Sequence, residues 1–401
     1  MDTQEILKKL TIETPSKIVL LVIDGLGGLP REETGKTELE EARIPNLTSL
    51  LERSICGLVD PILPGITPGS GPAHLALFGY DPFRYQIGRG VLAALGIGFP
   101  LEPGDVAIRG NFATVDEEGV ITNRRAGRIS TERSAELCRL FEGVEIEGVD
   151  IFVKPVKEYR IAVILRGEGL SDDLSDSDPQ REGLFPLEVK PITPSAEKTS
   201  HIVNEFISLA KRKLHHSYPA NSILLRGFSK HRIFPTFSEI YKLKAAAIAT
   251  YPMYKGIARL VGMAVLETGE DIDSQFKSLQ ENFNAYDFFY LHIKHTDSAG
   301  EDGNFEQKVV LIEEVDKNIP ILLDLSPDVI IVTGDHSTPA LLRSHSWHPC
   351  PILLYSRFCR RDSVVRFSER DCGSGGLGRF PAIHIMSLAL ANAQKLIKYG
   401  A

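Results

Sequence analysis

The stretch DVIIVTGDHSTP, residues 328–339, joins a strongly apolar run to an aspartate and a histidine. A continuous run of β-branched residues is typical of a parallel strand that is buried on both faces. Asp335 and His336 follow this run directly, so the strand would present both side chains at its carboxyl end. Ligands of open α/β sheets bind at that end of the strands. The stretch therefore predicts an α/β fold with a functional site at the carboxyl end of this strand.

Two further apolar runs end in metal-capable residues. KIVLLVI, residues 17–23, is followed by Asp24, and DFFYLH, residues 287–292, leads into DSAGEDG, residues 297–303. Because the carboxyl ends of parallel strands meet at one edge of a sheet, we expect these side chains to converge. The candidate metal ligands of the three strand ends are Asp24, Asp297, Glu301, Asp335, His336 and His345.

Carboxylates and imidazoles without cysteine suit Mn²⁺, Mg²⁺ or Zn²⁺ better than a thiolate site would. Two such ions would clamp a phosphoryl group and activate an oxygen nucleophile. Each residue also has a structural alternative. Asp24 could form a turn, His336 could be a hydrogen-bonded core histidine, and residues 297–303 could be a turn or a calcium-type loop, although they lack EF-hand spacing. The joint pattern favours a metal centre.

GSGPAH, residues 69–74, contains the candidate nucleophile Ser70. We expect Ser70 to be the N-cap of a short helix that begins near Pro72. Capping is the ordinary role of such a serine, but the position also exposes its oxygen beside free N–H groups that favour phosphate. Coordination to a metal would lower the pKa of the hydroxyl and activate it. The motif differs from the GxSxG elbow of α/β-hydrolases.

The chain of 401 residues is long enough for two domains. Alternating patterns over residues 106–116 and 120–128 predict antiparallel strands, and helical spacing covers residues 199–215. The α/β pattern resumes near residue 244. We therefore predict a discontinuous domain, residues 1–89 and 241–401, with an inserted domain at residues 90–240.

Composition narrows the class of protein. A net charge of −8 argues against nucleic-acid binding, which needs a basic surface. Five cysteines without a CxxC pair predict reduced thiols rather than a disulfide framework. The first fifteen residues lack the apolar core of a signal peptide, and no run is long enough for a membrane span. These features predict a soluble cytoplasmic protein that does not bind membranes.

The same residues belong to a longer series of motifs, which follow one another over residues 17–390. In order they are VIDGLGG, GKTELEEARIPNL, PGSGPAHLALFGYDP, GRGVLAALGIG, RGNFATVD, NRRAGRI, RGEGLSDDLSDSDP and VTGDHSTP. The series resembles the archaeal-type cofactor-independent phosphoglycerate mutases of the alkaline phosphatase superfamily. The resemblance implies an alkaline-phosphatase-like, mostly parallel sheet sandwiched by helices, with an inserted smaller α+β domain. It also implies conversion of 3-phosphoglycerate to 2-phosphoglycerate without added 2,3-bisphosphoglycerate.

Residue roles follow from the resemblance. Ser70 would become transiently phosphorylated. One metal would be held by Asp24, Ser70, Asp335 and His336, and the second by Asp297, Glu301 and His345. Many family members carry histidine where this chain has Glu301. The glutamate makes the second site harder, which favours Mn²⁺ or Mg²⁺ over Zn²⁺; Mn²⁺ is the first choice, Co²⁺ a further option, and Asp302 a substitute ligand.

The inserted domain would bind the anionic substrate, since arginine captures phosphate and carboxylate in bidentate fashion. Lys255 would face the phosphoryl group, and Asp176 and Asp178 would handle hydroxyl protons. The candidate arginines are Arg89, Arg109, Arg124, Arg125, Arg128, Arg166 and Arg226, of which Arg109, Arg128 and Arg166 are favoured. For the arginines and Lys255 the structural alternative is a solvated surface charge. For the two aspartates it is a role in a loop or a salt bridge.

Two other functions stay open. The first is hydrolysis or transfer of phosphate on another small phosphorylated metabolite, with the same fold and metals. The second is a metal-binding regulatory or structural protein without catalysis. Homo-oligomerisation is possible in each case.

Overall fold

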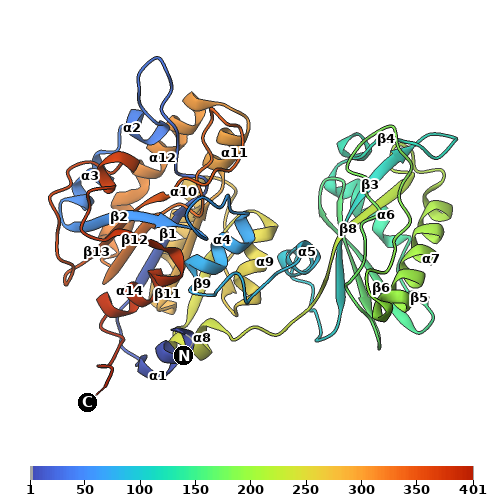
Figure 1. The fold of residues 1–401 in the computed structure, drawn as a ribbon, viewed down its shortest axis with the longest axis horizontal. Helices are drawn as coiled ribbons and strands as arrows, with labels where there is room; N and C mark the ends of the chain where they lie inside the picture. The colour runs from blue at the N-terminus through green and yellow to red at the C-terminus, as the bar shows by residue number, and fades with distance from the viewer. Residues whose placement is uncertain (1–2, 401) are drawn as a thin grey trace. The chain divides into compact units, whose positions relative to one another are not determined.

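The computed structural model describes residues 3–400 and divides into two compact units (Figure 1). The first unit joins the residues up to 86 to those from 235 onward, and the second unit consists of residues 87–234. The predicted insert, residues 90–240, differs from the second unit by a few residues at each end. The first unit is therefore discontinuous in sequence and holds all three of the strand ends described above.

A mostly parallel sheet of eight strands forms the centre of the first unit in the described part of the chain, in the order β10-β9-β11-β1-β12-β13-β2-β14. Strands β10, β9, β11, β1 and β12 are parallel, whereas β13 is antiparallel to both of its neighbours. The strands are β1 (Ile18–Ile23), β2 (Ser54–Asp60), β9 (Ala245–Ile248), β10 (Ala264–Val265), β11 (Phe288–Ile293), β12 (Val329–Thr333), β13 (Cys350–Ser356) and β14 (Gly378–Pro381).

Helices pack on both faces of this sheet. On one face, Phe276 of α10 and Ile312 of α12 belong to the same buried cluster as Leu21 of β1. On the other face, Phe237 of α8 packs against Phe288 of β11. The helices of the unit are α1 (Thr3–Leu10), α2 (Glu38–Glu41), α3 (Pro45–Leu51), α4 (Ser70–Leu77), α8 (Phe237–Tyr241), α9 (Pro252–Leu260), α10 (Ile272–Asn282), α11 (His295–Glu301), α12 (Phe305–Asp324), α13 (Glu369–Cys372) and α14 (Ile385–Asn392).

The second unit is an antiparallel sheet with three helices of eight or more residues in its described residues. Its strands follow the order β4-β3-β7-β6-β5, and β8 also pairs with β3. Helix α7 supplies Phe206 to the core of this unit, where the ring packs against Phe141. The elements are α5 (Arg89–Gly96), β3 (Val106–Val115), β4 (Ile121–Asn123), α6 (Thr131–Arg139), β5 (Val144–Ile146), β6 (Val149–Lys157), β7 (Arg160–Arg166), α7 (Glu197–Leu214) and β8 (Ser222–Lys230).

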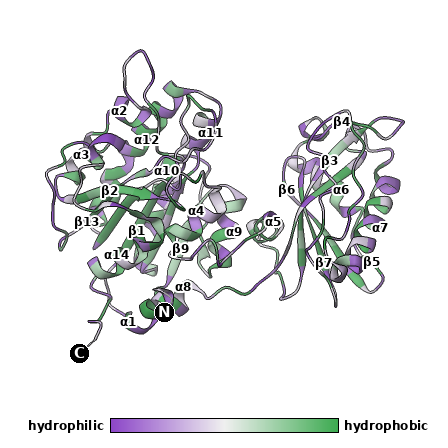
Figure 2. Cartoon of the chain, in the orientation of Figure 1, coloured by the Kyte–Doolittle hydropathy of each residue, from purple (hydrophilic) through white to green (hydrophobic). Residues whose placement is uncertain are grey.

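The central strands of the first unit carry the continuous apolar sequence that predicts burial on both faces. All residues of β1, β11 and β12 are buried, and the hydrophobic colours of these strands are visible in Figure 2. This confirms the predicted fold class, a mostly parallel sheet between helices with an inserted α+β domain. No helix within residues 3–400 combines the length and the apolar character that crossing a membrane requires.

The predicted strand over residues 120–128 is wrong in its second half. Strand β4 ends at Asn123, and a 3-10 turn follows at residues 126–128. Ala126, Gly127 and Arg128 have φ angles of 45°, 62° and 55°. This left-handed backbone is incompatible with an extended strand, so NRRAGRI forms a loop that displays its arginines.

Candidate metal centre

Strand register places the candidate ligands at one edge of the sheet. Strand β1 lies between β11 and β12, with Ile23 opposite Ile293 and Val22 opposite Thr333. Asp24 follows β1 immediately, and its N–H donates to the carbonyl of Ile293. The carboxyl ends of β11, β1 and β12 therefore lie at one edge of the sheet, which brings the residues that follow them to the same place.

The first group consists of Asp24, Asp335 and His336, whose ligand atoms lie within 4.8 Å of one another. Nε2 of His336 lies 3.5 Å from Oδ1 of Asp24 and 3.2 Å from Oδ2 of Asp335. All three side chains are fully buried. The hydroxyl of Ser70 lies 3.4 Å from the same Nε2 atom, so the candidate nucleophile adjoins this group.

The second group consists of Asp297, His336 and His345. Nε2 of His345 lies 3.7 Å from Oδ1 of Asp297, and the rings of His345 and His336 stack with centroids 3.6 Å apart. The predicted ligand sets assign His336 to the first metal alone, whereas the structure brings it into both groups. The reason is that Nε2 of His336 faces Asp24 and Asp335, whereas its Nδ1 lies 3.9 Å from Oδ1 of Asp297.

Glu301 lies beside the second group rather than within it. Its Oε1 is 3.8 Å from Nε2 of His345, and its side chain is 53% exposed. Burial, and then the charge of Asp297, raise the pKa of this carboxyl above its ordinary value. Its predicted role as a ligand of the second ion stays a prediction, and the same holds for Asp302.

The residues present fit a divalent cation. Oδ1 of Asp24 and Oδ2 of Asp335 are buried, and neither atom forms a hydrogen bond within residues 3–400. Burial lowers the pKa of His336 well below its ordinary value, so the ring is neutral and able to ligate. Unpaired buried carboxylate oxygens beside a neutral imidazole form a donor set that divalent metals prefer.

The pKa values of the two aspartates of the first group are shifted in opposite directions. Burial raises the pKa of Asp24, but Lys294, His292 and His336 outweigh it, so that the pKa lies well below its ordinary range. Burial raises the pKa of Asp335, and the negative charge of Asp24 raises it further. A bound cation would relieve this repulsion between the two carboxylates.

Two residues of the centre lie at the end of strand β11 and are not among the residues predicted from the sequence. Nε2 of His292 lies 3.2 Å from Oδ2 of Asp24. Nζ of Lys294 lies 3.4 Å from the same oxygen and also pairs with Asp297. Burial lowers the pKa of Lys294, but Asp24 and Asp297 outweigh it and raise the pKa, so the ammonium is charged. His292 and Lys294 lie at the end of the apolar run DFFYLHIK, and this position at a strand end is the signal that could have indicated them.

Three more residues that contact the candidate ligands or Ser70 are not among those predicted from the sequence. The hydroxyl of Tyr254 donates to Oδ2 of Asp24, and that of Thr338 donates to Oδ1 of Asp297 at 2.6 Å. Nδ1 of His74 lies 2.8 Å from the carbonyl oxygen of Ser70. Burial lowers the pKa of His74 to about 3, so its imidazole is neutral. The spacing of His74 from Ser70, one helical turn, could have indicated this contact.

Ser70 is not the N-cap that its sequence context predicts. Gly69 has the extended conformation of the cap, and Ser70 is the first residue of α4. The side chain is therefore not used to cap the helix and instead lies near His336. The first N–H groups of a helix lack partners within the helix, so the serine still lies at a position that favours phosphate.

Lys255 lies on α9, next to Tyr254, and its side chain is half-buried. The tyrosine contacts Asp24, so α9 runs beside the metal centre. The predicted role of Lys255 toward the phosphoryl group stays a prediction.

The second unit brings several of its candidate residues together. Arg109 of β3 lies opposite Arg226 of β8. Arg124, one of the candidate arginines, donates two hydrogen bonds to Asp178 at 2.9 and 2.6 Å. Asp176 accepts a hydrogen bond from the N–H of Gly227. Arg226 also interacts electrostatically with Asp176, Asp178 and Arg124, so these side chains form a charged patch around the middle of β3 and β8.

Three other arginines are placed differently. Arg125 and Arg128 line a cavity of about 580 Å³ together with Arg181 and Glu182. Arg166 is held by Asp105 and Glu102, at 2.8 and 2.7 Å, and lies over the ring of Phe152. These two ion pairs give Arg166 structural partners, so it differs from the solvated surface charge that is the alternative for the arginines. The predicted substrate contacts of all these arginines stay predictions.

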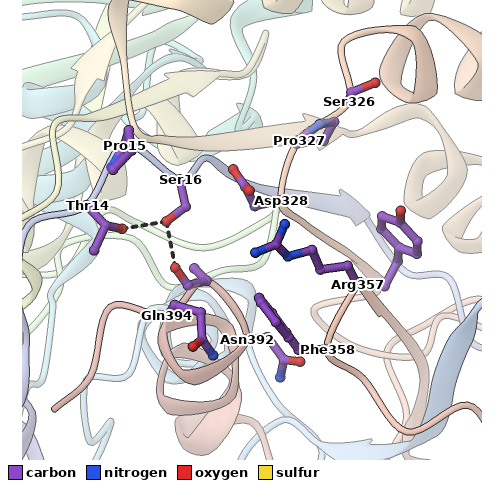
Figure 3. A pocket seen from close by; sticks show the side chains of 12 residues that line it. Thr14, Pro15, Ser16, Ser326, Pro327, Asp328, Arg357, Phe358, Asn392 and Gln394 are labelled. Carbon is purple, nitrogen blue, oxygen red and sulfur yellow. Dashed lines mark hydrogen bonds between the residues drawn. The ribbon is translucent and has the colours of Figure 1, made fainter.

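A further cavity of about 400 Å³ lies at the opposite end of the central strands. Ser16 and Asp328 precede β1 and β12, so this cavity is at the amino ends of the strands and away from the metal centre. Figure 3 shows the side chain of Arg357 extending toward Asp328, with Ser16 held to the chain by hydrogen bonds to Thr14 and Ala393.

The fold and the site define a mixed α/β protein with a carboxylate–imidazole cluster that could hold metal ions, beside a serine at the start of a helix. The family model described as 2,3-bisphosphoglycerate-independent phosphoglycerate mutase matches residues 52–220. Relatives from Thermus thermophilus and Thermotoga maritima are each 51% identical over the whole of both chains, and both are named "Probable 2,3-bisphosphoglycerate-independent phosphoglycerate mutase". The chain belongs to this family, which confirms the resemblance.

Two solved structures are similar in fold and sequence. A protein from Pyrococcus horikoshii is 32% identical with a TM-score of 0.83, and the match covers 97% of this chain and 100% of that one. The cofactor-independent phosphoglycerate mutase from Thermoplasma acidophilum is 33% identical with a TM-score of 0.74, and the match covers 94% and 100% of the two chains.

Proposed function

We propose that this protein interconverts 3-phosphoglycerate and 2-phosphoglycerate through a phosphoserine on Ser70. Membership of the mutase family supports the reaction. The observation that carries the mechanism is the position of the Ser70 hydroxyl, 3.4 Å from Nε2 of His336 at the edge of the buried metal group. The serine is therefore beside the place where the charge of a phosphoryl group could be compensated.

In the first step, Ser70 attacks the phosphorus of 3-phosphoglycerate. A bond forms between Oγ and phosphorus, the bond from phosphorus to the 3-oxygen breaks, and the hydroxyl proton is transferred to glycerate. In the second step, the 2-hydroxyl oxygen of the retained glycerate forms a bond to phosphorus, the bond from phosphorus to Oγ breaks, and the 2-hydroxyl proton is transferred to Ser70. Divalent ions, when bound, would lower the pKa of the attacking hydroxyl and offset the charge of the phosphoryl group.

Residues of the chain supply binding and orientation. Lys255 is proposed to stabilise charge on the transferring group, because α9 runs beside the metal centre. The arginines around β3 and β8 are proposed to bind the carboxylate and phosphate of the substrate. Asp176 and Asp178 are proposed to exchange protons with the substrate hydroxyls, and both already lie in that patch.

Mn²⁺ is the proposed ion, with Mg²⁺, Zn²⁺ and Co²⁺ as alternatives, because the donors are carboxylates and imidazoles. The reaction needs no 2,3-bisphosphoglycerate, since Ser70 itself carries the phosphoryl group. The cytoplasmic location and a homo-oligomer stay predictions.

The test is to incubate the Mn²⁺-loaded protein with 3-phosphoglycerate alone and to follow products by ³¹P NMR. We expect 2-phosphoglycerate from the parent protein and none from Ser70→Ala. Inorganic phosphate without 2-phosphoglycerate would favour the rival reaction, hydrolysis of a small phosphate ester. Equal product from the parent and from Ser70→Ala would overturn the proposed mechanism.

A further inference from the structure

The ammonium of Lys294 lies between the two halves of the metal centre. Its Nζ is 3.4 Å from Oδ2 of Asp24, in the first group, and pairs with Oδ2 of Asp297, in the second group. Lys294 follows β11 directly and precedes α11, so two regular elements fix its position. The side chain is 20% exposed, which limits how far water can screen these pairs.

The two aspartates differ in which oxygens they have available. Oδ2 of Asp24 receives the hydroxyl of Tyr254 and faces Lys294, but Oδ1 has no donor among residues 3–400 and lies 3.5 Å from Nε2 of His336. An ion in the first group can therefore take Oδ1 and leave the pair between Asp24 and Lys294 in place.

Asp297 has no such spare oxygen. Its Oδ1 accepts from the hydroxyl of Thr338 at 2.6 Å and faces His345 at 3.7 Å, while Oδ2 pairs with Lys294. An ion in the second group must therefore share Asp297 with one of these donors. The Thr338 hydroxyl also lies 3.0 Å from Nδ1 of His336, whereas the ammonium of Lys294 carries a full positive charge that repels a second cation.

We propose that Lys294 is an internal counter-cation that orders metal binding: the first ion binds at Asp24, Asp335 and His336, and the second must displace Lys294 from Asp297. This inference rests on the proposed two-metal function. In the metal-free protein the lysine offsets repulsion among three buried carboxylates. Loading of the second half is therefore coupled to movement of a single side chain.

The experiment compares the parent protein with Lys294→Met and Lys294→Gln, each freed of metal and titrated with Mn²⁺, with free Mn²⁺ measured by EPR. Lys277→Met is the matched control, because that lysine lies on α10 with its side chain 72% exposed. We expect two unequal classes of site in the parent. The weaker class should tighten at least tenfold in both Lys294 variants and stay unchanged in the control.

A second readout does not depend on metal affinity. The metal-free Lys294 variants should melt at a lower temperature than the metal-free parent, because the carboxylates lose their counter-charge, and Mn²⁺ should remove the difference. An unchanged or higher dissociation constant of the weaker class in the Lys294 variants would overturn the proposal.

A crystal of the parent protein soaked with Mn²⁺ gives a test that needs no variant. Lys294 Nζ should have left Asp297 wherever the second ion is present, and a retained contact would overturn the proposal. A parent protein that binds no Mn²⁺ in the titration would instead contradict the metal function itself, so the two failures are distinguishable.

Discussion

The hydroxyl of Ser70 lies 3.4 Å from Nε2 of His336, although 266 residues separate the two in sequence. His336 is brought there by the end of β12, and Ser70 by the start of α4. The imidazole belongs to both metal groups. The serine therefore adjoins the residue that links the two halves of the centre.

Metal removal should destabilise the first unit. Asp24, Asp297 and Asp335 are buried, and a ligand that binds the folded state alone at a hundred times its Kd stabilises it by about 2.7 kcal/mol. We expect EDTA to abolish mutase activity and to lower the melting temperature, and Mn²⁺ to restore both. An identical melting temperature with and without EDTA would speak against a metal-stabilised fold.

Glu301→His should change metal preference. Imidazole is a softer donor than carboxylate, so the ratio of Zn²⁺ affinity to Mn²⁺ affinity should rise by about tenfold. Competition titrations with both ions measure this ratio. Glu281→His is the matched control, since Glu281 lies on α10 with its side chain 62% exposed. An unchanged ratio in Glu301→His would show that this side chain does not reach the ion.

The strands of the first unit could be predicted from the sequence because β1, β11 and β12 are buried on both faces, which requires continuous apolar runs. The predicted strands also predict that Asp24 converges with Asp335 and His336. Residues that directly follow the carboxyl ends of adjacent parallel strands have little freedom to lie far apart. These parts of the fold and the site depend on local sequence and on the rule that the carboxyl ends of parallel strands meet at one edge of the sheet.

Other features depend on tertiary packing and could not be read from a local pattern. Tyr254 lies in the first turn of α9, and its contact with Asp24 spans 230 residues. No local sequence pattern distinguishes Lys294 from other lysines near strand ends. Its role is apparent only once the fold places Asp24 and Asp297 beside it. The left-handed turn at residues 126–128 also escaped detection, because Ala126 and Arg128 are not residue types that favour positive φ.

The pair between Arg124 and Asp178 should stabilise the second unit in a pH-dependent way. Burial raises the pKa of Asp178, but hydrogen bonds from Arg124 and Gln180 and the charge of Arg226 outweigh it and hold the pKa below its ordinary value. A carboxyl with a depressed folded-state pKa contributes stability above its unfolded pKa, about 3.9, and loses it as the pH falls through the folded pKa.

Asp178→Asn should therefore cost about 2 kcal/mol at pH 7, the scale of hydrogen bonds to a charged group. The difference from the parent should shrink below about pH 4. Urea unfolding at several pH values measures it, followed by probes within residues 87–234. A difference that stays constant across this pH range would contradict the assigned ionisation.

Lys308 should be needed for the shape of the loops that hold the metal ligands. Its buried ammonium donates to the carbonyls of Gly27 and Thr338, at 3.1 and 2.9 Å, and lies 3.7 Å from Oε1 of Glu38. Lys308→Met leaves these carbonyls and the carboxylate without their partner, a loss of about 3–5 kcal/mol. Denaturant unfolding of the first unit measures it, and a loss below about 1 kcal/mol would show that the network is dispensable.

The central claim is that Ser70 carries the phosphoryl group, and a quenched-flow experiment tests it most directly. Mn²⁺-loaded protein is mixed with 3-phosphoglycerate, quenched in acid within one turnover and digested, and the peptide that contains residues 69–74 is examined by mass spectrometry. We predict phosphate on Ser70 in the parent, none anywhere in Ser70→Ala, and turnover of that variant lower by roughly 10³-fold or more. Rapid formation of 2-phosphoglycerate with no phosphate on Ser70 at any time would contradict the account.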